Sequence, residues 1–210
     1  MKALDEFYNE YEEAIRRNFE NGTVKNAGGP EFVRGFGDAE ARVVLVGEAP
    51  GKDEVALGRP FVGKAGGILD EFLEATGIKR DELFITNTSK YRLARERKGG
   101  GGVANRPTTA FEIKQGALWL KKEIELIGPD IVVALGNVPL SALREAFLPD
   151  LAAKTIGECH GEAAETPVKD KKMIIYPVFH PASLIYNPGN RPAYEQDLRR
   201  LKTIMEVLAK

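Results

Sequence analysis

Apolar residues recur at helical spacing near both ends of the chain. In residues 1–20 they fall three or four positions apart, which predicts an amphipathic helix, and residues 194–208 repeat this spacing. Another apolar face, over residues 68–73, stands just before Gly77, a residue typical of the end of a helix. We also expect helices over residues 109–127 and 141–146.

Short runs rich in β-branched residues alternate with these helices. They span residues 42–46, 83–86, 130–135 and 173–178. Continuous apolar runs of this length are typical of strands buried in a parallel sheet. Because strands and helices alternate, the pattern predicts an α/β fold, a three-layer α/β/α sandwich around a central four-stranded, mainly parallel sheet.

Two polar segments interrupt the pattern. Residues 21–41 are rich in glycine and polar residues, which predicts a surface connection. Residues 92–108 include the run Gly99 to Gly102 and several cations, so we expect no core element there. The length of 210 residues predicts a single domain, 1–210.

Composition and charge narrow the function classes. The chain is 43% hydrophobic and 29% charged, as in ordinary globular proteins, with a formal net charge of -1. Because the charges almost balance, a polyanion would have to bind a local patch. Residues 90–106 carry Lys90, Arg92, Arg95, Arg97, Lys98 and Arg106 against the single acid Glu96. This segment is either a phosphate-binding patch or a solvated charged loop.

Targeting signals and cysteines are scarce. The N-terminus lacks the apolar core of a signal peptide, and no apolar run approaches the ~18 residues of a membrane span. We therefore expect a cytoplasmic protein without membrane contact. The single cysteine, Cys159, argues against an internal disulfide, a zinc site of several thiolates and a four-cysteine iron–sulfur cluster.

Residues able to do chemistry follow the predicted strands. Open α/β sheets bind ligands at the carboxyl ends of their strands. These ends carry GEAPG at 47–51, Asn87, GN at 136–137 and HPAS at 180–183. We therefore expect the four segments to converge on one site.

Two of these segments offer polar groups. In GEAPG, glycine and proline hold Glu48 on a tight turn, and the alternative is a turn with a solvated carboxylate. Asn87 presents an acceptor and two donors, which suits an imide edge such as that of uracil. The alternative for Asn87 is a cap or turn former.

Two further segments add an aromatic ring and a histidine. In GRPFVGKAGG, Phe61 offers a flat face for a base or plugs the core, and Lys64 stands near a helix start where a phosphate can bind. His180 can donate a hydrogen bond or carry charge near neutral pH, or it is structural. Leu184 and Ile185 form either an apolar wedge or ordinary packing.

Taken in order, GEAPG, GRPFVGKAGG, ITNTSKYR, DIVVALG and HPASLIYNP resemble the uracil-DNA glycosylase superfamily, and most closely its family four. The resemblance covers about residues 42–208. It implies a monofunctional DNA glycosylase of base-excision repair that flips uracil out of DNA and hydrolyses its N-glycosidic bond, leaving an abasic site. The partner would be uracil-containing DNA, single- or double-stranded, and the protein a monomer.

The resemblance also assigns roles to residues. Phe61 would stack on uracil, Asn87 would pair with its N3 and O4 edge, and His180 would stabilise charge at O2. Glu48, with Glu54 as a weaker candidate, would activate water. The substrate-binding turn would include Ala49, Pro50 and Gly51. DNA contacts would come from Lys64, Ser89, Ser183, Leu184, Ile185 and Arg191.

Three departures from the family pattern matter. Family four binds a four-iron cluster through four cysteines, whereas two of the corresponding places here are Tyr91 and Gly116, so we expect no cluster, no metal and no cofactor. A related branch traps its product through a histidine in an insertion, but residues 1–159 contain no histidine. Family-one enzymes have an aspartate where this chain has Ala49, so the resemblance assigns no water-activating role to that position.

Two other functions stay open. One is a protein that keeps the pocket but reads damaged or single-stranded DNA without turnover. The other is a glycosylase that prefers a deaminated purine, if the pocket is wider near Tyr91 or the glycine-rich insertion.

Overall fold

The computed structural model describes residues 2–62, 64–151 and 153–208, except the side chains of residues 64, 65 and 68. Its centre is a six-stranded sheet in the order β1-β3-β2-β6-β8-β7. The four inner strands are β3 (Leu83–Asn87), β2 (Val43–Gly47), β6 (Ile131–Leu135) and β8 (Lys171–Val178), and they run parallel. The four strands predicted from apolar runs are therefore confirmed.

The sheet is wider than predicted, because a short antiparallel strand closes each edge. β1 (Phe36–Gly37) pairs with β3, and β7 (Ala164–Val168) pairs with β8. β1 has only two residues within a glycine-rich segment, and β7 alternates exposed and buried positions, so neither has the continuous apolar run of a buried strand.

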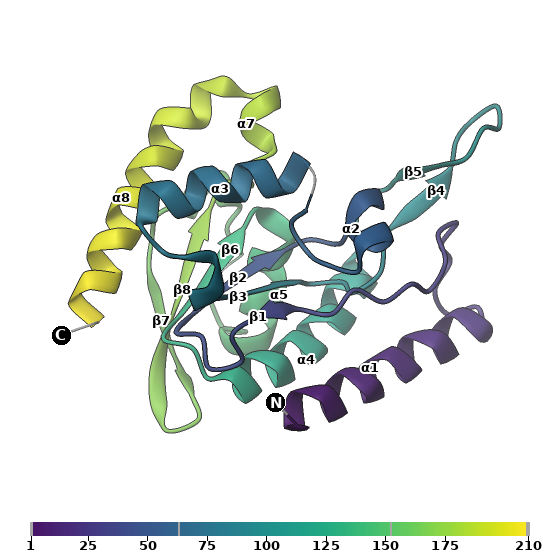
Figure 1. Cartoon of the computed structure of the whole chain (residues 1–210), viewed down its shortest axis with the longest axis horizontal. Helices are drawn as coiled ribbons and strands as arrows, with labels where there is room; N and C mark the ends of the chain where they lie inside the picture. The colour runs from purple at the N-terminus through teal and green to yellow at the C-terminus, as the bar shows by residue number, and fades with distance from the viewer. Residues whose placement is uncertain (1, 63, 152, 209–210) are drawn as a thin grey trace.

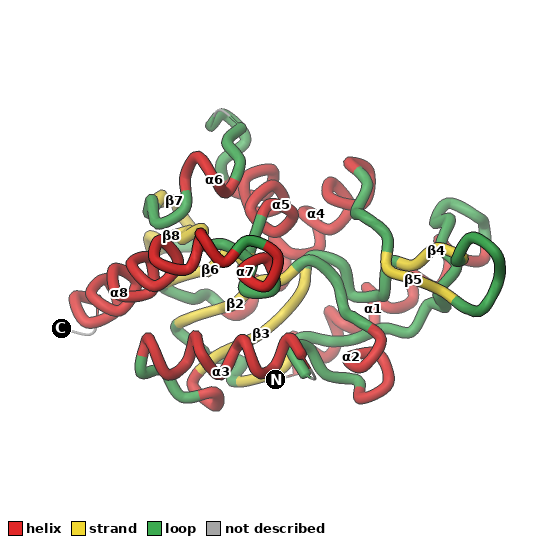
Figure 2. Tube along the Cα trace, turned by 90° about the horizontal axis from the view of Figure 1, so that it is seen from above, coloured by secondary structure: helices red, strands yellow, loops and turns green. Residues whose placement is uncertain are grey.

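Helices cover both faces of the sheet, which gives the predicted three layers (Figures 1 and 2). On one face, α3 (Lys64–Thr76) packs against α8 (Arg191–Leu208). On the other, α4 (Ala110–Ile127) packs against α5 (Asn137–Phe147) and α1 (Lys2–Glu20). Burial of the inner strands is nearly complete, since every residue of β2, β3 and β6 is buried.

Short elements connect these layers. The sequence did not predict the helices α2 (Lys52–Leu57), α6 (Ile156–Cys159) and α7 (Ser183–Tyr186), or the 3-10 turns η1 (Arg80–Glu82) and η2 (Pro188–Asn190). No helix in the described ranges is long and apolar enough to cross a membrane.

Most of the segment 92–108 lies outside the core, as predicted, but Leu93 and Ala94 at its start are buried, and Leu93 packs into the core. The segment folds into the hairpin β4 (Ala94–Glu96) and β5 (Val103–Asn105), which protrudes from the body of the molecule (Figures 1 and 2). Gly99 to Gly102 form its tip with φ angles of 92°, 82°, 91° and 104°, a region that glycine adopts without steric cost.

Candidate active site

A cavity of about 370 Å³ lies at the carboxyl ends of the inner strands. It brings together eight of the predicted residues: Glu48, Ala49, Pro50, Gly51, Glu54, Phe61, Asn87 and His180. The parallel register explains part of this convergence, because Gly47 at the end of β2 is paired with Asn87 at the end of β3. His180 arrives from the end of β8.

Gly47 allows two of these side chains to approach each other. A β-carbon at Gly47 would lie 2.8 Å from two carbons of the Phe61 ring and would also clash with Oδ1 of Asn87. The Asn87 amide and the Phe61 ring therefore both lie against the bare backbone of Gly47. An amide edge and an aromatic face placed in this way can pair with and stack on one flat ring.

The backbone of Phe61 is held in an unusual conformation. Its φ is 53°, in the left-handed region that non-glycine residues seldom adopt. The Phe61 amide donates to Oε1 of Glu54 at 2.5 Å, and Arg80 donates to the Phe61 carbonyl at 2.8 Å. These bonds stabilise a strained backbone beside a cavity, where strain of this kind tends to be found.

Glu54 braces the loop between the GEAPG turn and Phe61. Its second oxygen accepts from the Gly51 amide at 2.5 Å, so the carboxylate joins both ends of the loop. Burial raises the pKa of Glu54, and the two amide bonds partly offset that shift. Both of its oxygens are thus engaged with the protein.

Glu48 is held differently. One of its oxygens accepts a 2.5 Å hydrogen bond from the hydroxyl of Thr108, and the side chain is partly exposed to the cavity. The Glu48 carbonyl accepts from the Ser89 amide at 2.9 Å, which ties the turn to the segment after β3.

His180 is suited to donating a hydrogen bond. Burial lowers its pKa, and the nearby charge of Glu48 opposes the shift without cancelling it. Nδ1 of His180 accepts from the Ala182 amide at 3.1 Å, so the neutral ring carries its proton on Nε2.

The segment 92–108 supplies a wall that the sequence analysis missed. Leu93, Asn105, Arg106 and Pro107 line the same cavity, and Thr108 follows them. A signal was present, because Thr109 and Glu112 form the capping box that starts α4. That motif fixes the helix start and places residues 105–108 directly before it.

The predicted basic patch is smaller than its sequence suggests. Lys90 is buried in an ion pair with Glu123, whereas Arg106 is half-buried at the cavity wall and its charge is paired with Glu112 at 2.6 Å. The exposed cations of the segment are on the hairpin: Arg95, Arg97 and Lys98.

The predicted DNA-contact residues fall into different environments. Ser89 is buried, and its hydroxyl donates to the Tyr91 carbonyl, so it offers no surface to a phosphate. On α7, Leu184 is buried, which makes it packing, whereas Ile185 is 64% exposed. Tyr186, which the sequence analysis did not select, is 88% exposed.

The other three predicted DNA contacts are Ser183, Arg191 and Lys64. The hydroxyl of Ser183 donates to the His180 carbonyl at 2.6 Å, and Arg191 pairs with Glu71 at 3.2 Å on the surface. Lys64 begins α3, but its side chain lies outside the described residues.

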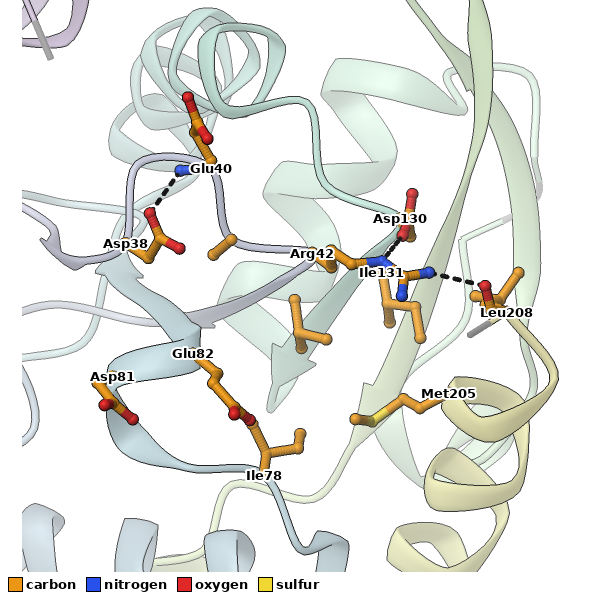
Figure 3. A pocket seen from close by; sticks show the side chains of 12 residues that line it. Asp38, Glu40, Arg42, Ile78, Asp81, Glu82, Asp130, Ile131, Met205 and Leu208 are labelled. Carbon is orange, nitrogen blue, oxygen red and sulfur yellow. Dashed lines mark hydrogen bonds and ion pairs between the residues drawn. The ribbon is translucent and has the colours of Figure 1, made fainter. Parts of the chain in front are cut away.

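A larger cavity, of about 510 Å³, lies at the opposite end of the sheet (Figure 3). Its carboxylates are Asp38, Glu40, Asp81, Glu82 and Asp130. Arg42, which also lines it, is bonded to Asp130 at 2.5 Å and to the Leu208 carbonyl at 2.8 Å. Carboxylates repel phosphate, so the smaller cavity is the better candidate for a nucleic-acid substrate.

The fold agrees with comparisons to known proteins. Residues 34–202 match the family model described as the uracil DNA glycosylase superfamily. The chain belongs to the uracil-DNA glycosylase superfamily. The family resemblance seen in the sequence motifs is thereby confirmed.

Curated relatives include type-4 uracil-DNA glycosylases. That of Archaeoglobus fulgidus is 35% identical over 81% of this chain and 80% of its own length. That of Thermotoga maritima is 35% identical over 83% of each chain. A type-5 uracil-DNA glycosylase of Pyrobaculum aerophilum is 30% identical over 73% of this chain and 67% of its own length.

These relatives contradict the expectation that no cofactor is involved. Type-4 uracil-DNA glycosylases are the iron–sulfur branch of the superfamily, so the relationship implies a cluster. The donor set of this chain does not fit four-thiolate ligation, because its one cysteine, Cys159, is buried on α6 and bonded to the Thr155 carbonyl.

Proposed function

We propose that the protein excises uracil from DNA by hydrolysing the N-glycosidic bond, leaving an abasic site and free uracil. The observation that carries this proposal is the meeting of the Asn87 amide and the Phe61 ring over Gly47, in a cavity also lined by Glu48 and His180. The names of the curated relatives, uracil-DNA glycosylases of types 4 and 5, support the same reaction.

Asn87 would read the base. Uracil presents a donor at N3 and an acceptor at O4, which the acceptor and donor of one side-chain amide complement. Cytosine presents the reverse pattern and would leave these groups unpaired. Each buried group left unpaired costs ~1–3 kcal/mol, so Asn87 favours uracil.

His180 and Glu48 would share the chemistry. As the glycosidic bond breaks, negative charge grows on uracil, and the Nε2 proton of neutral His180 would stabilise it at O2. Glu48 would orient or activate the water that attacks C1′ of the sugar. Glu54 is less suited to this task, because both of its oxygens are occupied by backbone amides.

The nucleotide would have to leave the helix stack to reach this cavity, which costs a few kcal/mol in a duplex. The exposed side chain of Ile185, near His180 in the chain, is the candidate to occupy the vacated space. We propose that the protein acts as a monomer on uracil-containing DNA, single- or double-stranded.

The test is excision from end-labelled oligonucleotides that carry one uracil, hypoxanthine or xanthine, in single-stranded and paired forms. Wild type would be compared with Asn87→Ala and His180→Ala, and with Glu82→Gln in the acidic cavity as a matched control. We expect abasic sites at uracil, formed far more slowly by the first two variants and at the wild-type rate by the control.

Two outcomes would overturn the proposal. Tight binding of uracil-containing DNA without cleavage would indicate a reader of damaged DNA. Faster release of hypoxanthine or xanthine than of uracil would indicate a glycosylase for deaminated purines.

A further inference from the structure

A lysine that the reaction does not use is buried behind the base-reading residue. The side chain of Lys90 is 1% exposed. Its ammonium donates to Oγ1 of Thr86 at 2.6 Å, to the carbonyl of Asn87 at 2.7 Å and to Oε2 of Glu123 at 2.7 Å. An ammonium has three protons, so all of its donors are used inside the protein.

This ion pair is poorly explained by stability alone. Glu123, on α4, is 0% exposed, and its other oxygen accepts from the hydroxyls of Thr86 and Tyr8. Removing two charges from water is expensive, and apolar side chains of similar volume often give equal stability. Burial also lowers the pKa of Lys90, although Glu123 opposes that shift. Stability therefore does not explain why a charged pair is buried at this place, and its contacts must be considered.

The ion pair lies at Asn87, the last residue of β3, and contacts the backbone there. Lys90 bonds to the carbonyl of Asn87 itself, while the next two amides bond to the GEAPG turn. Thr88 donates to the Gly47 carbonyl at 2.8 Å, and Ser89 donates to the Glu48 carbonyl at 2.9 Å. The peptide plane after Asn87 is thus held on both sides, which restricts the direction of the Asn87 side chain.

We infer that Lys90, paired with Glu123, is a positioning residue that holds the Asn87 amide over Gly47 for uracil. Lys90 is not among the residues that line the cavity, so it acts through Asn87 and not on the substrate. The inference rests on the proposed function and adds a determinant of base selection outside the pocket.

The test uses a double variant, Lys90→Met with Glu123→Gln, which removes the ammonium without leaving an unpaired buried carboxylate. Single-turnover excision of uracil and inhibition by free uracil would be measured in the wild-type and Asn87→Ala backgrounds. In the wild-type background we expect excision to slow about 10- to 100-fold and free uracil to bind more weakly. In the Asn87→Ala background the same change should have less than about a twofold effect.

Tyr8→Phe is the matched control. It removes a hydroxyl that donates to the same Glu123 but does not contact Asn87. We expect it to lower the melting temperature while leaving the rate of uracil excision and the inhibition by uracil unchanged. If the Lys90–Glu123 pair had a purely structural role, the double variant would behave like Tyr8→Phe, with a lower melting temperature and an unchanged rate of uracil excision.

Equal losses in the two backgrounds, or no loss in either, would overturn the inference. If the double variant does not fold, Glu123→Gln alone enters the same comparison, with a smaller loss expected that again depends on Asn87. Failure of the proposed function is distinguishable, because the wild-type protein would then release no uracil.

Discussion

Thr108 donates a 2.5 Å hydrogen bond to the carboxylate of Glu48, across 60 residues of chain. It comes from the segment that the sequence analysis left outside the core, and it reaches the residue proposed to activate water. The hydrogen bond gives the carboxylate a fixed orientation beside the cavity.

Replacing Thr108 with valine keeps the shape of the side chain and removes this donor. We expect single-turnover excision to slow about 10- to 100-fold with little change in DNA affinity, because a hydrogen bond to a charged group contributes ~1.5–3 kcal/mol. Thr203→Val, at an exposed position of α8, is the control. An unchanged excision rate in Thr108→Val would show that Glu48 does not depend on this bond.

The close approach over Gly47 gives a second prediction. The methyl group of Gly47→Ala would overlap the Phe61 ring and the Asn87 amide, so we expect excision to fall about 100-fold or more. Gly67→Ala adds the same methyl on α3 with no atom within 4 Å. That control should keep its activity. Full activity of Gly47→Ala in the same oligonucleotide assay would contradict the proposed pocket.

The lowered pKa of His180 predicts a pH dependence. Because the folded-state pKa lies below the ordinary value near 6.5, the unfolded chain binds a proton more readily. The free energy of unfolding should therefore decrease as pH falls below about 6.5 toward the folded-state pKa. Excision should also decrease as the ring becomes protonated, since the neutral form is the proposed donor.

Urea unfolding of wild type and His180→Asn between pH 7.5 and 5 isolates the contribution of His180 to the free energy of unfolding. The difference between the two proteins should shrink as pH falls. Parallel curves over the whole range would show that His180 is not the group responsible.

The hairpin cations give a prediction about DNA affinity. We expect the triple substitution of Arg95, Arg97 and Lys98 by alanine to weaken DNA binding for all sequences alike. The slope of log affinity against log salt should become shallower by about 0.7–0.9 for each phosphate that the variant no longer neutralises. Lys171→Ala, at the opposite end of the sheet, is the control. If the triple variant and the wild-type protein gave the same slope, DNA would not bind at the hairpin.

The sequence was sufficient for the parallel strands and for three of the four segments expected at their carboxyl ends, since residues 136–137 are not among those that line the cavity. Continuous apolar runs identify buried strands, and parallel strands bring Glu48, Asn87 and His180 to one edge. Burial of individual cations was not predictable in this way. Whether Lys90 is solvated or paired depends on Glu123, which lies 33 residues away in the chain and comes close only in the folded protein.

The wall formed by residues 105–108 was missed for a related reason. Glycines and charges correctly indicate an exposed hairpin tip, but they do not show that Leu93 joins the core or which cavity the segment borders. The short edge strands were missed because β1 is exposed and β7 is only partly buried, so neither has the continuous apolar run that identifies a buried strand.

The pairing of Gly47 with Asn87 constrains how this chain can change in length. Successive side chains of a strand point to opposite faces, so inserting one residue within β2 or β3 would reverse the faces beyond it. The strands could still pair, yet the amide and the bare backbone would no longer meet. The tip of the β4–β5 hairpin, where added atoms meet nothing within 4 Å, has no such requirement. Insertions and deletions should therefore accumulate at the tip and be excluded from β2 and β3. Among homologues, the strands whose length does not vary would then mark the edge of the pocket.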